Sequence, residues 1–300
     1  MINGEFKDSA TAFHGKYLGV LKKRIDQKEE DPVTQTFEFA TNALEPDQET
    51  FTRKIEWRVV KNFLLKLRIT DPIVHGSKTK PYFVVIDGDQ NLYFIDLTND
   101  KSPKAIFIAD KVQDACFAPN QNEILVIRSV QSSQLFWNID TSSWTKNAGE
   151  YSGSDWSTAS YSPDGTLIAI YKVGGKLLIF DKKTFRLEKE IHLPEIGNRR
   201  VRNILWNRDS KQILVSMSIK EMLLLDYKTG KPLLRWDFGM RMIHDVQFSN
   251  DGESIWVLEG STIFDRLKST QRRLFRFYAP RNKTTETITK PESGQITLSP

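Results

Sequence analysis

The chain has 300 residues, 39% of them hydrophobic and 11% aromatic, so it can bury the core of one large all-β domain or of two ordinary domains. Charged residues make up 27%, and no apolar run approaches the roughly 18 residues that cross a bilayer, which argues against a membrane-spanning segment. The net charge of +5 is local, because residues 261–300 carry eight Lys/Arg and three Asp/Glu.

The N-terminal residues 1–8 lack the basic start and apolar stretch of a secretory signal. The single cysteine, Cys116, excludes a disulfide framework and a cysteine-based zinc site. Both features predict an intracellular, cytoplasmic protein. Residues 1–35 show no recognisable repeat and are expected to form an extension, whereas residues 36–300 are expected to form a single domain.

Apolar segments along the first hundred residues predict strands. Three of them precede any recognisable turn motif: residues 36–40, 52–57 and 63–68. A clear hairpin then follows, with strands at residues 81–86 and 92–96 around an Asp-Gly-Asp turn, where Asp and Gly supply the backbone angles that a tight turn needs.

An internal repeat is the strongest signal in the sequence. Four segments each place an aromatic anchor before a polar turn, and the anchors are Phe117, Tyr161, Trp206 and Phe248. Their spacings of 44, 45 and 42 residues are typical of four-stranded propeller blades. The anchors are therefore expected to occupy equivalent buried positions in successive blades.

Further strands follow the anchors at fixed distances. Second strands are predicted at residues 124–127, 167–171, 213–216 and 255–258. Third strands are predicted to close with Asp96, Asp140, Asp181 and Asp226. The runs are continuously apolar, which indicates strands covered on both faces, as in blades that pack on blades. The alternating segments 187–191 and 232–236 are expected to be outer fourth strands.

These turns carry a resemblance to a known family. Residues 161–165 (Tyr-Ser-Pro-Asp-Gly) and 248–252 (Phe-Ser-Asn-Asp-Gly) resemble the first-strand turn of WD-repeat propellers, and residues 229–231 resemble the turn after the third strand. The resemblance covers about residues 70–280. The Trp-Asp dipeptide and the Gly-His pair are absent, so the buried hydrogen-bond network of that family is not carried over. Propellers of the TolB type share the Ser-Pro-Asp-Gly turn and are the alternative.

The last residues suggest how the ring closes. Residues 296–300 superimpose on residues 159–163, which predicts a lone first strand that shares a blade with three N-terminal strands. The expected fold is thus an all-β propeller of about six four-stranded antiparallel blades, closed by N- and C-terminal strands. The rival hypothesis is that the chain is a piece of a longer propeller, with residues 294–300 as a loose tail.

No residue pattern predicts catalysis, a cofactor site or a metal site. The histidines, at positions 14, 75, 192 and 244, show no ligand spacing, and no Gly-x-Ser-x-Gly nucleophile motif occurs. An enzyme with its site in the central channel would need acidic or histidine side chains on the innermost strands. Those strands instead contribute Ala115, Ala159, Ile204 and Val246, which do not favour an active site in the channel. An enzyme of this kind is therefore kept as an alternative function, as is a sensor domain in a larger assembly.

Two basic clusters are the candidate partner-binding residues. The first, in a blade-joining loop, comprises Arg199, Arg200 and Arg202. The second, in the last hairpin, comprises Arg266, Lys268, Arg272, Arg273 and Arg276. Such clusters are either charged edges that prevent sheet aggregation or patches that bind phosphate or an acidic protein surface.

The expected function is that of a non-enzymatic, WD-repeat-like scaffold for protein–protein interactions. Its protein partners are expected to present an acidic surface. Base-specific binding of nucleic acid is not expected, because the sequence shows neither a recognition helix nor surface aromatics interleaved with basic residues.

Overall fold

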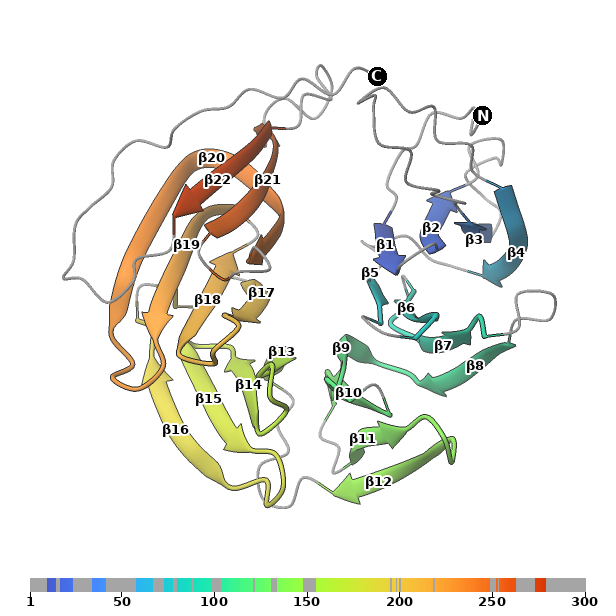
Figure 1. Cartoon of the computed structure of the whole chain (residues 1–300), viewed down its shortest axis with the longest axis horizontal. Helices are drawn as coiled ribbons and strands as arrows, with labels where there is room; N and C mark the ends of the chain where they lie inside the picture. Colours follow the sequence, from blue (N-terminus) through green and yellow to red (C-terminus); the bar gives the residue numbers. More distant parts are fainter. Residues whose placement is uncertain are drawn as a thin grey trace, which may run out of the picture. The chain divides into compact units, whose positions relative to one another are not determined.

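The computed structural model folds the chain into β-strands (Figure 1). The structure describes the strands between residues 10 and 66, at 10–14, 17–23, 34–41 and 58–66, and most of residues 73–278, with gaps at 78–79, 88, 99–103, 121, 131–133, 148–154, 195, 198, 200, 218, 249–251, 253 and 263–272. The chain forms two compact units, Met1–Ser154 and Asp155–Pro300, which are described separately.

The first unit contains three four-stranded antiparallel sheets, each with its strands in chain order. The sheets are β1 (Ala10–His14), β2 (Tyr17–Lys23), β3 (Thr34–Thr41) and β4 (Arg58–Lys66); β5 (Ile73–Gly76), β6 (Tyr82–Ile86), β7 (Leu92–Asp96) and β8 (Lys104–Ala109); and β9 (Val112–Phe117), β10 (Glu123–Arg128), β11 (Gln134–Asn138) and β12 (Ser143–Asn147). First strands contact one another, β1 with β5 and β5 with β9. Sheets that meet along their first strands are arranged as propeller blades.

The second unit contains one further four-stranded sheet and one six-stranded sheet. Their strands are β13 (Trp156–Tyr161), β14 (Leu167–Lys172), β15 (Lys176–Asp181) and β16 (Leu187–His192); and β17 (Val201–Trp206), β18 (Gln212–Met217), β19 (Ile219–Asp226), β20 (Pro232–Phe248), β21 (Ser254–Thr262) and β22 (Arg273–Tyr278). The first strands β13 and β17 again contact each other. The prediction of four-stranded antiparallel blades is confirmed by the four sheets of that size.

Strand β20 explains the six-stranded sheet. Its first part pairs with β19, for example at Trp236 opposite Met222, and its last part pairs with β21, for example at Val246 opposite Val257. One 17-residue strand thus serves as the fourth strand of one blade and the first strand of the next. The sequence predicted two separate strands here, one at residues 232–236 and one that ends at Phe248. No turn residues mark the point at which the strand passes from one blade to the next.

The N-terminal sheet differs from the sequence prediction. Four strands between residues 10 and 66 form it, where three were predicted, and β1 and β2 lie in the segment expected to be an extension. The predicted strand at residues 52–57 and the predicted closing strand at residues 294–300 lie outside the described residues. A count of about six blades and closure by both termini therefore stay predictions.

The aromatic anchors occupy equivalent positions, as the repeat predicted. They are the last residues of β9, β13, β17 and β20, and each pairs with an isoleucine of the following strand: Phe117 with Ile124, Tyr161 with Ile168, Trp206 with Ile213 and Phe248 with Ile255. Tyr161 and Trp206 are buried, but Phe117 and Phe248 are only half-buried. The prediction of equal burial is therefore wrong for two of the four anchors.

The turn after the third strand is also repeated. The carboxylates of Asp181 and Asp226 each accept a hydrogen bond of 2.6 Å from a threonine backbone N–H three residues later. Asn138 fills this position after β11, since its Oδ1 accepts bonds from the Thr141 N–H at 2.8 Å and from the Thr141 hydroxyl at 2.9 Å. Assigning Asp140 to this position was wrong, because Asn and Asp present the same side-chain oxygen to the turn and apolar patterning does not distinguish them.

Hydrophobic cores lie between neighbouring blades. In β18, Ile213 and Val215 pack with Tyr171 of the preceding blade, whereas Leu214, between them, packs with Val246 of the following strands. Alternate side chains of one strand thus enter opposite cores. This arrangement explains the continuous apolar runs in the sequence, because both faces of a middle strand are covered.

Candidate interaction surface

Two kinds of loop meet at one end of every blade. Because each blade is an antiparallel meander, the connection to the next blade lies beside the turn between its second and third strands. We call this edge the connection end. Loops on a rigid framework are where binding residues concentrate, so this end is the first place to search for a site.

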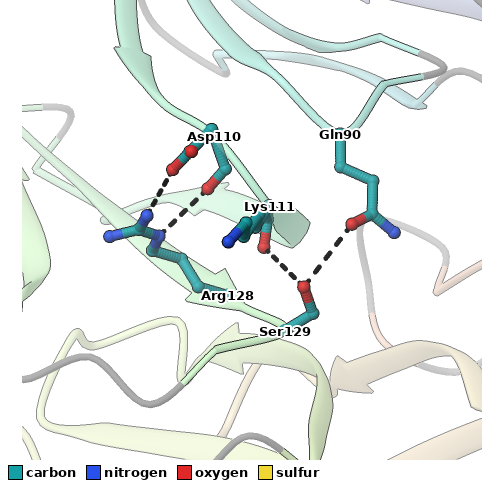
Figure 2. A network of polar contacts seen from close by, with 5 residues as sticks. All are labelled: Gln90, Asp110, Lys111, Arg128 and Ser129. Carbon is teal, nitrogen blue, oxygen red and sulfur yellow. Dashed lines mark hydrogen bonds and ion pairs between the residues drawn. The ribbon is translucent and has the colours of Figure 1, made fainter.

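In the first unit, the connection end between the second and third blades is short and tightly bonded (Figure 2). Asp110 and Lys111 alone join β8 to β9. The Arg128 Nε donates to the Asp110 carbonyl at 3.0 Å, and the Arg128 guanidinium also pairs with the Asp110 carboxylate. The Ser129 N–H donates to the Lys111 carbonyl at 2.7 Å.

The same network joins neighbouring blades. The turn between β6 and β7 contributes the Gln90 carbonyl, which accepts a bond of 2.8 Å from the Val112 N–H. The Ser129 hydroxyl lies 3.1 Å from the Lys111 carbonyl and 3.5 Å from the Gln90 Oε1 (Figure 2). Most of these bonds satisfy backbone groups, so this network serves to hold the blade junction rigid.

In the second unit, a longer connection spans residues 193–200 between β16 and β17. Leu193 and Ile196 are buried in the core between the blades. The Leu193 N–H donates to the Gly175 carbonyl at 2.7 Å, and the Tyr171 hydroxyl donates to the Gly197 carbonyl at 2.9 Å. This loop is therefore packed down on the turn between β14 and β15.

Arg199, a predicted candidate, extends from this loop to a buried acid. Its Nε donates to the Ile196 carbonyl at 3.2 Å, and its Nη1 lies 3.1 Å from the Glu221 Oε1. Arg235, from β20, places its Nη2 2.9 Å from the Glu221 Oε2. We call Arg199, Glu221 and Arg235 the arginine clamp. The Glu221 side chain is 4% exposed, whereas those of Arg199 and Arg235 are 39% and 51% exposed.

Opposing effects act on the Glu221 carboxyl. Burial raises its pKa, but the contacts with the positive charges of Arg199 and Arg235 together outweigh burial and hold the pKa below its ordinary value of 4.5. Glu221 is thus ionised at neutral pH. The arginine clamp carries a net charge of about +1 at the connection end, from two cations and one anion.

The remaining candidates fall in different places. Arg202 is exposed on β17, and Arg200, Arg266, Lys268 and Arg272 lie outside the described residues. Arg273 and Arg276 lie on β22, opposite Glu259 and Trp256 of β21, and the structure describes only their backbone. The structure unites Arg199 with Arg235, which sequence reasoning missed. A signal was present, because Glu221 directly precedes the apolar run of residues 222–225, and an acid buried there needs a cationic partner.

One pair of polar groups lies on the innermost strands of the first unit. The His75 Nε2 of β5 is 3.6 Å from the Oδ1 of Asp114 on β9, and that oxygen also accepts a hydrogen bond from the Ala115 N–H at 2.9 Å. The sequence reading of these strands stressed Ala115 and overlooked its neighbour. Within the described residues, no three His, Cys, Asp or Glu side chains form a group that could hold a metal ion.

The described part of the chain contains no helix that is long and apolar enough to cross a membrane.

Comparison with known proteins gives one partial similarity. No family model matches the chain. The chain is 27% identical over 124 residues to THO complex subunit 3 of Arabidopsis thaliana, and this region is 41% of the chain. It covers 38% of the length of that curated relative. The chain thus resembles part of a complex subunit.

Proposed function

We propose that this chain is a non-enzymatic, WD-repeat-like propeller that acts as a scaffold for protein–protein interactions. The observation that carries the proposal is the contrast between repeated blades and unlike connections. Anchors and turns recur from blade to blade, whereas the connections range from residues 110–111 through residues 193–200 to the unbroken β20. Variation concentrated in the connections between repeated elements is typical of scaffolds that hold partners.

The similarity to THO complex subunit 3 supports membership of an assembly, because that protein is by its name a subunit of a complex. We propose that this chain is likewise a component of an intracellular multi-protein complex and binds partners that present acidic surfaces. The His75–Asp114 pair is the observation that favours the alternative, an enzyme with a site on the innermost strands.

Purification from cells tests the scaffold proposal. The full chain, carrying an affinity tag, is expressed in its own cells, recovered at physiological salt after nuclease treatment, and analysed by size-exclusion chromatography and mass spectrometry. We expect proteins in fixed stoichiometry with the chain, which are absent when the tag alone is expressed. Elution of the chain as a monomer, without stoichiometric partners, would contradict the proposal.

The C-terminal basic residues are proposed as a second contact with partners. Replacing Arg272, Arg273 and Arg276 with Ser is expected to remove a salt-sensitive part of partner recovery, because surface charge attraction is screened by salt. Stability should stay almost unchanged. Equal recovery of partners by this variant and the unaltered chain, at low and at high salt, would identify the cluster as a solvated edge.

A further inference from the structure

We propose that the arginine clamp binds an acidic peptide segment of a protein partner, an inference that rests on the scaffold function. The site comprises the exposed parts of Arg199 and Arg235. Glu221 is the buried group that holds both guanidinium groups in place.

The first argument is that Arg199 and Arg235 are ordered before any ligand binds. Arg199 is bonded to the Ile196 carbonyl at 3.2 Å and to Glu221, and Ile196 itself is buried in the core. The Arg235 Nη2 forms an ion pair, at 2.9 Å, with the other oxygen of the same carboxylate. Immobilising a long, flexible surface side chain costs conformational entropy on binding. Here much of that ordering is already present in the free chain.

The second argument is chemical. A guanidinium group is planar, carries five N–H donors and matches a carboxylate in a bidentate manner. About half of the Arg235 side chain is exposed although its Nη2 contacts Glu221. A net positive, part-exposed pair of guanidinium groups suits Asp or Glu side chains, whose oxygens accept these bonds without needing a proton.

The third argument distinguishes a peptide from a nucleic acid. The arginine clamp offers a ligand two guanidinium groups, those of Arg199 and Arg235. Nucleic acid binding depends on a track of cations along many phosphates, whereas two or three carboxylates suffice for a peptide.

Fluorescence anisotropy with the full chain tests the inference. The probe is a short fluorescein-labelled peptide that repeats Glu-Ser-Glu-Leu, with a Gln-Ser-Gln-Leu counterpart and an oligouridylate of equal length as comparisons. We expect the acidic peptide to bind and to weaken as salt rises, and the neutral peptide not to bind. Tighter binding of oligouridylate than of the acidic peptide would overturn the inference in favour of nucleic acid, provided that this binding is lost when Arg199 or Arg235 is replaced.

One arginine variant and one matched control locate the site. Arg235→Gln is expected to weaken peptide binding about tenfold, the loss of one charge-assisted contact. Lys176→Gln removes the same charge from a side chain that is 41% exposed and pairs with Glu190 in the same unit, and it should change binding less than about twofold. Equal weakening by both variants would indicate general charge attraction and overturn the inference.

A third variant controls for folding and net charge. Arg199→Gln combined with Glu221→Gln leaves the net charge unchanged and removes the buried carboxylate together with one partner. We expect about tenfold weaker peptide binding from a chain that still unfolds cooperatively. If this variant binds the peptide as well as the unaltered chain does, the inference is wrong.

Partner recovery separates this inference from the scaffold proposal. If the unaltered chain recovers no partner from cells, the scaffold proposal itself fails. If the unaltered chain and both arginine variants recover the same partners equally, and the acidic peptide does not bind, then only the clamp inference fails.

Discussion

Glu221 lies in a strand whose next residues, Met222 and Leu223, are fully buried, an environment that penalises an isolated carboxylate. The two arginines that meet it come from separate parts of the chain, the β16–β17 connection and β20. The buried acid is therefore retained by contacts that form only when both blades are folded, and its stability contribution depends on its charge.

Acid is expected to release the contribution of Glu221. Because its pKa is lowered on folding, the charged form stabilises the folded chain above pH 4.5, and this stabilisation is lost as the pH falls from 4.5 through the lower folded pKa. Urea denaturation at neutral pH and near pH 3 should show a smaller loss of stability in Glu221→Gln than in the unaltered chain. An identical pH profile for the two chains would show that Glu221 is not coupled to folding.

Asn138 provides a test of the repeat at single-residue scale. Asn138→Ala removes two hydrogen bonds to Thr141 and is expected to lower the free energy of unfolding by about 0.5 to 1.5 kcal/mol. Asp140→Ala, two residues on at an exposed position, should change it by less than about 0.5 kcal/mol. Chemical denaturation of both variants checks this, and the reverse order would restore Asp140 as the closing residue.

The buried anchors should be more sensitive than the half-buried ones. Trp206 is 6% exposed and packs 5.3 Å, ring centre to ring centre, from Tyr227, so Trp206→Ala is expected to cost about 3 to 5 kcal/mol. Phe248→Ala, at a half-buried anchor, should cost about 1 to 3 kcal/mol. Thermal unfolding measures both. A near-neutral Trp206→Ala would show that the anchors do not fill the cores.

At the scale of elements, the turn between β14 and β15 supports the arginine clamp. Gly174 and Gly175 both have positive φ, at 104° and 83°, which side chains of L-residues rarely adopt. They differ in surroundings. A Cβ on Gly175 would lie 2.6 Å from the Leu193 carbonyl oxygen, whereas a Cβ on Gly174 would meet nothing within 4 Å.

This difference predicts unequal effects of alanine. Gly174→Ala should cost about 1 to 2 kcal/mol, the strain of a left-handed backbone. Gly175→Ala should cost more, and it should speed hydrogen exchange of the Leu193 N–H, which bonds the Gly175 carbonyl. Urea denaturation and exchange measurements check both variants. Equal costs with unchanged exchange would mean that the 193–200 connection is not held by this turn.

For the whole molecule, the four strands β1–β4 bear on the role of the C-terminal residues. These strands already form a complete four-stranded sheet. Deleting residues 291–300 is therefore expected to leave amide exchange of β1–β4 as slow as in the full chain, with β13–β16 as internal reference. Faster exchange confined to β1–β4 would instead support the shared blade that the sequence predicted.

The sequence alone determined the blade framework, because a repeat of 42 to 45 residues, aromatic anchors and continuous apolar runs are local or periodic features. It also singled out Arg199, by its place in a blade-joining loop. Tertiary structure alone decided three features: the contacts of Arg199 and Arg235 with Glu221, the place of Asn138 and not Asp140 at the turn after β11, and the joining of two predicted strands in β20. These features depend on which residues meet across strands. Packing between blades sets that pairing, and no regular spacing of residues in the sequence reports it.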